Sequence, residues 1–547
     1  MINRGQIQYA ILGLVVVSII VSGASLAVLS GSISGVKKNV NNLADELSSQ
    51  LDKIEQDISA IGPGQEQPPG DNEKPPSEGE EFPAYASGID WNSPKPWKDR
   101  LTEMEVLDKV PVEEWSQYQP KLKDAMNAQY PNNGPCAVGY TLPDGWEEAV
   151  GDVEELTYFN SGGLSHDSAT VTLLSRFEKK TGIHVNAQPL GLESILLKTT
   201  STMTSKNASP QVIQNFPDVN LLHFGKAGWL EKLNWFWPEK LQELYPPGYI
   251  ANVSTPAGNF YNSGMIAYKT TGLFYRPSVL KEVTGSSDPP QTMKELIDVS
   301  RQISEQTNMY GLALPNKNYK YVGNYLNALL ASQGEDYIED GKFYPKGEPY
   351  KKAFTTYVNF VKEGGCPEAS FGWSWTDAPE VFARGNAAMV IAGMTYASTW
   401  EQNPSDAIKG DWAVLKTPPL EEGMDPSTTI SASSAWGINP YASKEQKAAA
   451  AILLDMMRSK AHAFNELVIE GNEAWMESVY ELPVAKERVN AIEMRKKMAM
   501  TGMPQILPVN GSEILKLQRE YVYKAATGDM SIEEAISAVQ DQISQYQ

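Results

Sequence analysis

The sequence predicts an α/β fold for the large part of the chain that follows residue 151. Glu155–Phe159 is typical of a short strand, and a helix with Val171, Leu174 and Phe177 on one face follows it. That helix stops at Gly182, and a second strand, Ile183–Ala187, begins directly afterwards. A strand–helix–strand unit with a glycine stop indicates a parallel α/β sheet.

The same alternation continues to the C-terminus. Further strand candidates are Asp218–Phe224, Gly272–Tyr275, Ala387–Ile391 and Trp412–Leu415. Helix starts are indicated by capping boxes, in which a Ser or Thr is followed three residues later by Glu or Gln. These are Thr292 with Glu295, Ser443 with Gln446, and Ser531 with Glu534.

Composition limits the class of partner. The chain has 547 residues, 41% of them hydrophobic, and a formal net charge of −21. This charge argues against nucleic acid or anionic lipid as a partner. With four histidines and two cysteines, no cluster has zinc spacing, so no metal or other cofactor is expected.

The first 36 residues form an apolar segment. Ile7–Val28 exceeds the roughly 20 residues that a membrane-spanning helix needs, and no charge occurs between Arg4 and Lys37. The order Arg4-Gly5-Gln6 resembles the class III, type IV pilin-like signal of archaeal surface proteins. That resemblance implies cleavage after Gly5, with Gln6 as the first mature residue and the helix retained as an anchor. A cleaved secretory signal is the alternative.

Three segments separate this anchor from the α/β body. Residues 37–61 carry apolar residues at spacings of three and four, which indicates a helical stalk that self-associates or lies alone. Residues 62–83, rich in Pro, Gly and Glu, are expected to be an extended linker. Residues 84–151, rich in Trp and Pro, are expected to be an N-terminal extension packed on the body.

The body resembles the extracellular solute-binding proteins of ABC importers, in the branch that includes maltose-binding protein. Phe177-Glu-Lys-Lys-Thr-Gly-Ile-His-Val185 is similar to the opening motif of that family, and Pro217-Asp-Val219 to a strand start. Gly272-Leu-Phe-Tyr275 and Pro289-Pro-Gln-Thr-Met-Lys-Glu-Leu296 resemble two later motifs. Phe382-Ala-Arg-Gly-Asn-Ala-Ala-Met389 is the most specific match.

The resemblance implies a two-lobed fold of the periplasmic-binding-protein type, whose lobes close on a ligand by hinge motion. Lobe 1 would comprise residues 152–271 and 420–482, and lobe 2 residues 272–419 and 483–547. Hinge strands would lie near Tyr268–Tyr275, Lys416–Leu420 and Leu482–Val484. The function implied is capture of a carbohydrate outside the cell and delivery to a permease.

Sugar sites pair flat aromatic rings with hydrogen-bonding groups, which here occur after strands or at positions matched to the family. The candidate ligand-binding residues are His166, Asp167, His223, Phe224, Trp375, Asp377, Tyr396 and Trp436. Trp436 stands where many members have a glycine-rich segment. A place in the core is the alternative for each aromatic ring.

Other interpretations of the sequence remain open. The ligand could instead be a peptide or another polar solute, and a structural surface subunit would also fit the anchor and stalk. No nucleophile elbow, zinc-protease motif or phosphate loop points to an enzyme. A glycosidase needs only a pair of carboxylates, which an acidic chain offers, but the order of the family motifs would then be accidental. Cys136 and Cys366 either pair or stay as two buried thiols. The triplets at Asn207, Asn252 and Asn510 are possible glycosylation sites.

Overall fold

The computed structural model describes residues 82–546, except 118–133, 162–167, 191, 216, 335–337, 340–341, 346, 403, 427 and 505–510. The predicted anchor, the stalk and all but the end of the linker lie outside this range. Among the described residues, no helix has both the length and the apolar content needed to cross a bilayer.

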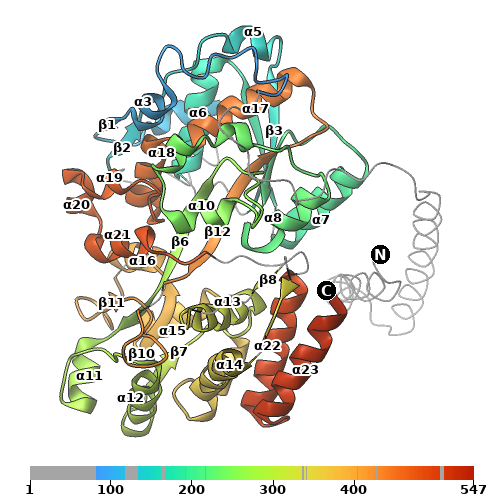
Figure 1. Cartoon of the computed structure of the whole chain (residues 1–547). Coiled ribbons are helices and arrows are strands. Elements are labelled where there is room, and N and C mark those ends of the chain that lie inside the picture. The colour runs from blue at the N-terminus through green and yellow to red at the C-terminus, as the bar shows by residue number, and fades with distance from the viewer. Residues whose placement is uncertain are drawn as a thin grey trace, which may run out of the picture. The chain divides into compact units, whose positions relative to one another are not determined.

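One sheet runs through the body in the order β4-β3-β5-β12-β6-β10-β7, with β11 also paired to β6 (Figure 1). β6 (Met265–Tyr275) is shared by two halves. Its first half pairs with β12 (Ile430–Ile438), and Thr271–Tyr275 pair with β10 (Ala387–Gly393). The two halves have separate hydrophobic cores, so the fold is two-lobed and of mixed α/β type, as predicted.

Lobe 1 is built on the strands to one side of β6. β3 (Glu155–Ser161), β4 (His184–Leu190) and β5 (Val212–Asn215) are parallel, and β12 runs antiparallel to β5. Its helices are α6 (Ser168–Thr181), α7 (Leu192–Thr204), α8 (Pro217–Lys226), η3 (Asn234–Phe236), α9 (Glu239–Gln242), α10 (Pro247–Val253), α17 (Lys444–Met457), α18 (Lys460–Asn465), the π-helix η5 (Glu466–Glu470), α19 (Glu477–Tyr480), α20 (Pro483–Arg488) and α21 (Ile492–Met500).

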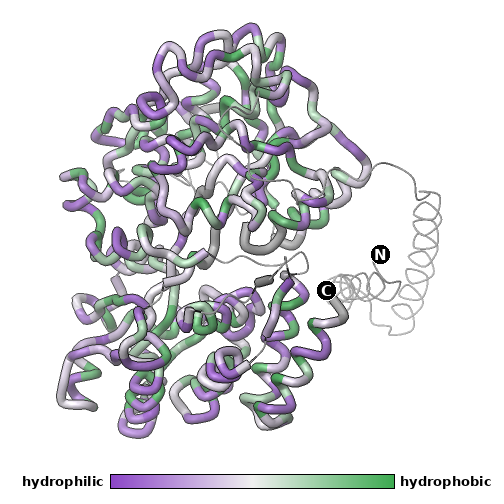
Figure 2. Tube along the Cα trace, in the orientation of Figure 1, coloured by the Kyte–Doolittle hydropathy of each residue, from purple (hydrophilic) through white to green (hydrophobic). Residues whose placement is uncertain are grey.

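Lobe 2 contains β10, β7 (Tyr310–Ala313), β11 (Ala413–Leu415) and the hairpin of β8 (Ile338–Glu339) and β9 (Lys342–Phe343). Its helices are α11 (Pro277–Thr284), α12 (Met293–Gln306), α13 (Tyr319–Ala331), α14 (Gly347–Lys362), η4 (Glu368–Gly372), α15 (Asp377–Ala383), α16 (Thr395–Gln402), α22 (Gly511–Thr527) and α23 (Ile532–Tyr546). Hydrophobic residues lie along the strands of this lobe, and its outer helices carry many hydrophilic residues (Figure 2).

The chain crosses between the lobes three times. β6 is one crossing, as predicted. The second lies at Thr428–Ile430 rather than 416–420, because Leu420 packs in the core of lobe 2. The third passes Met503, whose N–H donates to the Thr428 carbonyl. It does not lie at 482–484, because Ala485 and Val489 belong to the core of lobe 1.

The predicted strand 218–224 is wrong. Residues 217–226 form α8, and the strand of this region, β5, ends before it. Pro217 stands at the first helical position, where a proline lacking an N–H is tolerated and its fixed φ suits the helix. The capping boxes at Ser443 and Ser531 are confirmed, and Thr292 accepts the Glu295 N–H as expected.

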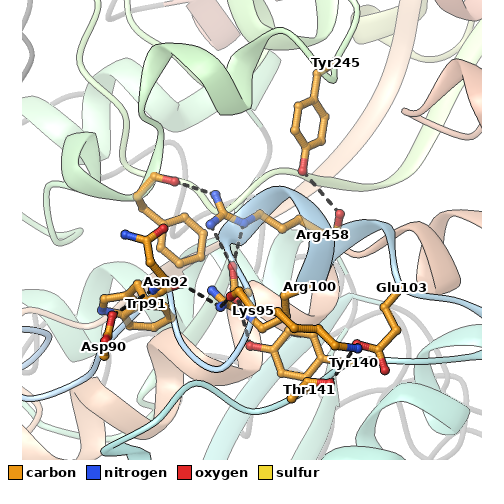
Figure 3. Close-up of polar contacts among 12 residues, drawn as sticks. Asp90, Trp91, Asn92, Lys95, Arg100, Glu103, Tyr140, Thr141, Tyr245 and Arg458 are labelled. Atoms are coloured by element: carbon orange, nitrogen blue, oxygen red, sulfur yellow. Dashed lines mark hydrogen bonds and ion pairs between the residues drawn. The ribbon is translucent and has the colours of Figure 1, made fainter.

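The N-terminal extension packs into the core of lobe 1. It contains α3 (Trp97–Thr102), β1 (Glu105–Leu107), η1 (Val112–Gln117), β2 (Cys136–Val138) and α5 (Trp146–Val150). Arg100 reaches from α3 to Asp455 of α17, with its Nε donating to Oδ2 over 2.9 Å. Tyr140 donates to the same oxygen at 2.7 Å, and Arg458 donates to Oδ1 at 2.7 Å (Figure 3).

This network is fully buried. Burial alone would raise the pKa of Asp455, but Arg100 and Arg458 outweigh it and hold the pKa below its ordinary value. Arg100 also donates to the main-chain carbonyls of Trp91 and Lys95. The extension is therefore tied to lobe 1 by paired charges as well as by its tryptophans.

Of the two alternatives for the cysteines, the structure shows two buried thiols and no disulfide. Cys136 lies in the core of lobe 1 and Cys366 in that of lobe 2, and both are free thiols. Burial raises the pKa of each thiol to about 12, so neither is reactive at neutral pH. Asn252 is only 3% exposed, which contradicts its use for glycosylation. Asn207 is exposed and stays a prediction, and Asn510 lies outside the described residues.

Candidate functional site

The strand ends place α16 at the junction of the lobes. Gly393, the last residue of β10, pairs with Thr271, in the middle of the shared strand β6. The Met394 N–H donates to the Thr270 carbonyl, and α16 starts at the next residue. Because β10 ends where β6 passes from one lobe to the other, residues at the start of α16 lie beside lobe 1.

Lobe 1 meets α16 through the turn that follows η5. Gly471 has φ +72°, a left-handed conformation that favours glycine. A Cβ atom at this position would lie 2.5 Å from the Ser398 side chain. The fully buried Arg495 of α21 donates from Nη1 to the Ser398 Oγ at 2.9 Å. Glycine thus allows the close approach of the turn to α16, and Arg495 bridges the two lobes.

Arg495 is held in place by a buried carboxylate. Its Nη2 donates to the carbonyls of Gly471 and Asn472, and its Nε to Glu473 Oε2 at 3.3 Å. Glu473 also accepts hydrogen bonds from Tyr480 and from Thr270 of the shared strand. Burial raises the pKa of Glu473 against the opposing effect of Arg495. The turn, the hinge strand and α16 therefore share one polar network.

The same turn also contacts the start of α6. Glu470 Oε1 accepts a hydrogen bond from the Ala169 N–H at 3.0 Å, which satisfies one of the free N–H groups of the first helical turn. We call the meeting place of these elements the interlobe seam. Its residues are Ala169, Glu470, Gly471, Trp375, Tyr396 and Ser398. His166 and Asp167, which precede α6, lie outside the described residues.

The seam presents one tryptophan ring to solvent. The Trp375 side chain is 49% exposed, although it is large and apolar. Tyr396 of α16 donates from its hydroxyl group to the Trp375 carbonyl at 2.9 Å. Asp377 accepts hydrogen bonds from the N–H and hydroxyl of Ser374, and these bonds lower the pKa of Asp377. The structure thus brings three predicted residues together, with Tyr396 and Asp377 holding the turn that carries Trp375.

The other predicted residues lie apart from this turn. His223 is exposed on α8, with its ring edge-on to Trp229 at 5.4 Å. Burial lowers its pKa, and Glu513 of α22 opposes this. Phe224 is 3% exposed in a small core with Ile213, which contradicts a ligand contact.

Trp436 is also a core residue. It has no exposed surface, and its ring packs against Tyr158 with centroids 4.8 Å apart. The predicted ligand platform at this position is therefore wrong. β12 lies between β5 and β6 in the middle of the sheet, and that central position explains the burial.

Sequence reasoning missed several residues of the seam and of its immediate surroundings. Tyr321 of α13 is close enough to Tyr396 to contribute, after burial, to the raised pKa of that hydroxyl. Ser398, Glu470 and Arg495 were not singled out either. A clustering of tyrosines at 319 and 321 was the available signal for Tyr321, whereas Ser398 and Glu470 have ordinary local sequences. No group of three His, Cys, Asp or Glu side chains suitable for a metal occurs in the described part of the chain.

Comparison with known proteins supports this architecture. The model of the bacterial extracellular solute-binding protein family matches residues 172–498. Among solved structures, the chain is similar to maltose-bound MalE3 of T. maritima, with 21% identity and a TM-score of 0.62 over 72% of this chain and 100% of that one.

Two other structures match nearly as well. A solute-binding protein of an ABC transporter from Agrobacterium radiobacter K84, in complex with ribitol, has 19% identity and a TM-score of 0.61, covering 73% of this chain and 100% of that one. The sugar-binding protein MalE of Xanthomonas citri has 18% identity and a TM-score of 0.60, covering 72% and 96%. At these identities the likeness shows the fold alone.

Proposed function

The chain belongs to the family of bacterial extracellular solute-binding proteins, and from this premise we propose that it captures a carbohydrate at the interlobe seam. The observation that carries the proposal is Trp375 at the junction of the lobes, whose indole ring is half exposed and whose main-chain carbonyl accepts a hydrogen bond from Tyr396. An indole face packs well on the C–H face of a sugar ring. Maltose and ribitol are the ligands of two structures similar to this chain.

In this proposal the protein works as a receptor. The lobes close on the sugar, and the closed form then docks on the permease subunits of an ABC importer, which receive the solute. The protein performs no chemistry on its ligand. Two observations support a receptor. The family consists of binding proteins, and a polar network around Arg495 joins both lobes at the seam.

A thermal-shift series with maltose, maltotriose, ribitol and mannitol tests the proposal. A ligand that binds only the folded state raises the melting temperature. We expect maltose or maltotriose to do so with the native chain and Trp375→Ala to abolish most of that shift without lowering the melting temperature of the unliganded protein. Leu197→Ala, at a similarly exposed apolar residue of α7, is the matched control and should keep the full shift.

Two outcomes would contradict this proposal. One is the absence of a shift with all four compounds together with binding of a peptide mixture, which would make the solute a peptide. The other is a loss of stability of about 3–5 kcal/mol in Trp375→Ala, since that magnitude is typical of a core aromatic residue.

We place the receptor outside the cell, anchored by the helix predicted for Ile7–Val28. The sequence order Arg4-Gly5-Gln6 supports processing by a pilin-type peptidase, and the stalk and linker would hold the body away from the membrane. We predict that the native protein sediments with membranes and that its first residue is Gln6. N-terminal sequencing of the membrane fraction checks this, and a mature N-terminus beyond Ser30 on protein released into the medium would show a discarded signal instead.

A further inference from the structure

A cavity of about 220 Å³ lies between the N-terminal extension and lobe 1. Glu103, Glu105 and Val138 line it from the extension, and Thr172 and His462 line it from α6 and α18. None of the residues of the interlobe seam lines this cavity. The family match begins at residue 172, so the extension wall lies outside the family-wide part of the chain. We call this space the extension cavity.

Two almost fully buried residues of the extension cavity, His462 and Thr172, have side-chain groups without hydrogen-bond partners in the described part of the chain. His462 is 2% exposed, and neither of its ring nitrogens is hydrogen-bonded. Thr172 is 1% exposed, and its hydroxyl group is equally unsatisfied. Leaving such a group unpaired costs about 1–3 kcal/mol. A polar occupant of the cavity would recover this free energy.

Two of the four charged residues that line the cavity, Glu103 and Arg176, are already paired. Glu103 accepts hydrogen bonds from Lys95 at 2.8 Å and from Thr141 at 2.7 Å (Figure 3). Arg176 lies 3.2 Å from a carboxylate oxygen of Glu114. A charged ligand would have to compete with these ion pairs.

The unsatisfied groups favour a neutral ligand. Burial lowers the pKa of His462 to about 3, so the ring is neutral; with its N–H on Nε2, which lies 3.5 Å from Glu466 Oε1, Nδ1 is the acceptor left for a ligand. The Thr172 hydroxyl both donates and accepts. The buried Glu466 carboxylate, 3.5 Å from His462 Nε2, would repel an anion. Hydroxyl groups, which both donate and accept, match this set.

We propose that the extension cavity is a second binding site, separate from the seam, for a small uncharged polyol. A cavity of about 220 Å³ suits a tetritol or pentitol better than an oligosaccharide. Thr172 and His462 bind hydroxyl groups at the inner wall, and Glu105 stands exposed on the extension side. The inference does not depend on the ligand proposed for the seam.

Titration calorimetry of the full-length chain with xylitol tests the site. Glu105→Trp places a bulky ring at the cavity, and we expect it to abolish the saturable heat. Thr172→Val removes one hydroxyl group at nearly constant volume and should weaken binding about three- to tenfold. Glu113→Trp is the matched control, because Glu113 is equally exposed on the extension but does not line the cavity; it should bind as the native chain does.

Trp375→Ala separates this site from the seam. Xylitol binding that persists in Trp375→Ala and disappears in Glu105→Trp supports the proposal, whatever happens to sugar binding at the seam. Xylitol binding lost in Trp375→Ala and kept in Glu105→Trp would place the polyol at the seam and overturn it. The absence of any saturable heat with the native chain would also overturn the proposal and would indicate that the cavity holds only water.

Discussion

The Tyr396 hydroxyl group holds the main chain of the turn that carries Trp375. Tyr396→Phe removes this donor and keeps the ring packed against Trp400. A single net hydrogen bond contributes about 0.5–1.5 kcal/mol, so we expect sugar affinity to fall about three- to tenfold with little change in unfolding temperature. Calorimetric titration measures this. Tyr523→Phe on α22 is the control, and equal affinities for both variants would show that the turn needs no such support.

Gly471 sets the distance between the η5 turn and α16. Gly471→Ala combines a left-handed φ with a Cβ atom 2.5 Å from the Ser398 side chain. We expect a loss of about 2–4 kcal/mol in the free energy of unfolding, from overpacking and backbone strain. Ser398→Gly in the same chain removes the clash and should recover part of this loss. Urea denaturation of the single and double variants measures the coupling, and strict additivity would argue against the contact.

Two tryptophans also show which property the sequence alone did not predict, namely the burial of a side chain. Trp375 and Trp436 each lie in or directly after a short polar stretch. From the sequence they are therefore equally good candidates for a ring that stacks on the ligand. Trp375 lies on an exposed turn, whereas Trp436 lies on a central strand with no exposed surface. Burial of Trp436 depends on β12 being inserted between β5 and β6, and this pairing joins segments more than 150 residues apart. Local sequence does not contain that information.

At the scale of elements, the extension depends on the ionised Asp455. Its pKa is depressed in the folded protein, so its contribution to stability is complete above the unfolded value of about 3.9 and is lost as the pH falls below it. We expect the unfolding temperature of the native chain to drop steeply below about pH 4. Asp455→Asn should be much less stable at neutral pH, because two buried arginines lose their counter-charge, and should show a flatter acid profile.

Tyr140→Phe tests whether the acid transition depends on the charge of Asp455 or on one of its hydrogen bonds. It removes one hydrogen bond to Asp455 and leaves both arginines paired. We expect a loss of about 1.5–3 kcal/mol with the acid transition kept, and differential scanning calorimetry across pH measures both quantities. An acid profile that is the same in Asp455→Asn and in the native chain would assign the transition to other carboxylates.

Elements with strong local signals were predicted well. Ser443 and Ser531 start helices in the expected way, and β3, α6 and β4 follow the predicted strand–helix–strand order. The failure at Pro217 has a local cause. The apolar run that follows is compatible with either a strand or a short helix, and a proline can stand before a strand as well as at the first position of a helix.

For the whole molecule, the order of motifs was enough to predict two lobes, but not where the chain crosses between them. The actual second and third crossings, near Thr428–Ile430 and Met503, are joined by main-chain hydrogen bonds between distant segments. α19, α20 and α21 stay in lobe 1 because their apolar residues, such as Val479 and Ala485, fill its core. Only three-dimensional packing decides in which lobe such short helices lie.

The two-lobed arrangement leads to a prediction about motion. A ligand that contacts both sides of the seam binds the closed form more tightly, so it shifts the population of the molecule toward closure. We expect a saturating sugar to reduce the radius of gyration in small-angle scattering of the native chain. Ser398→Ala removes the hydroxyl that Arg495 contacts across the lobes and should alter the size of this change without touching Trp375. Scattering curves that superimpose with and without the sugar, under conditions where calorimetry shows saturation, would exclude closure and leave a rigid receptor whose site is formed before the ligand arrives.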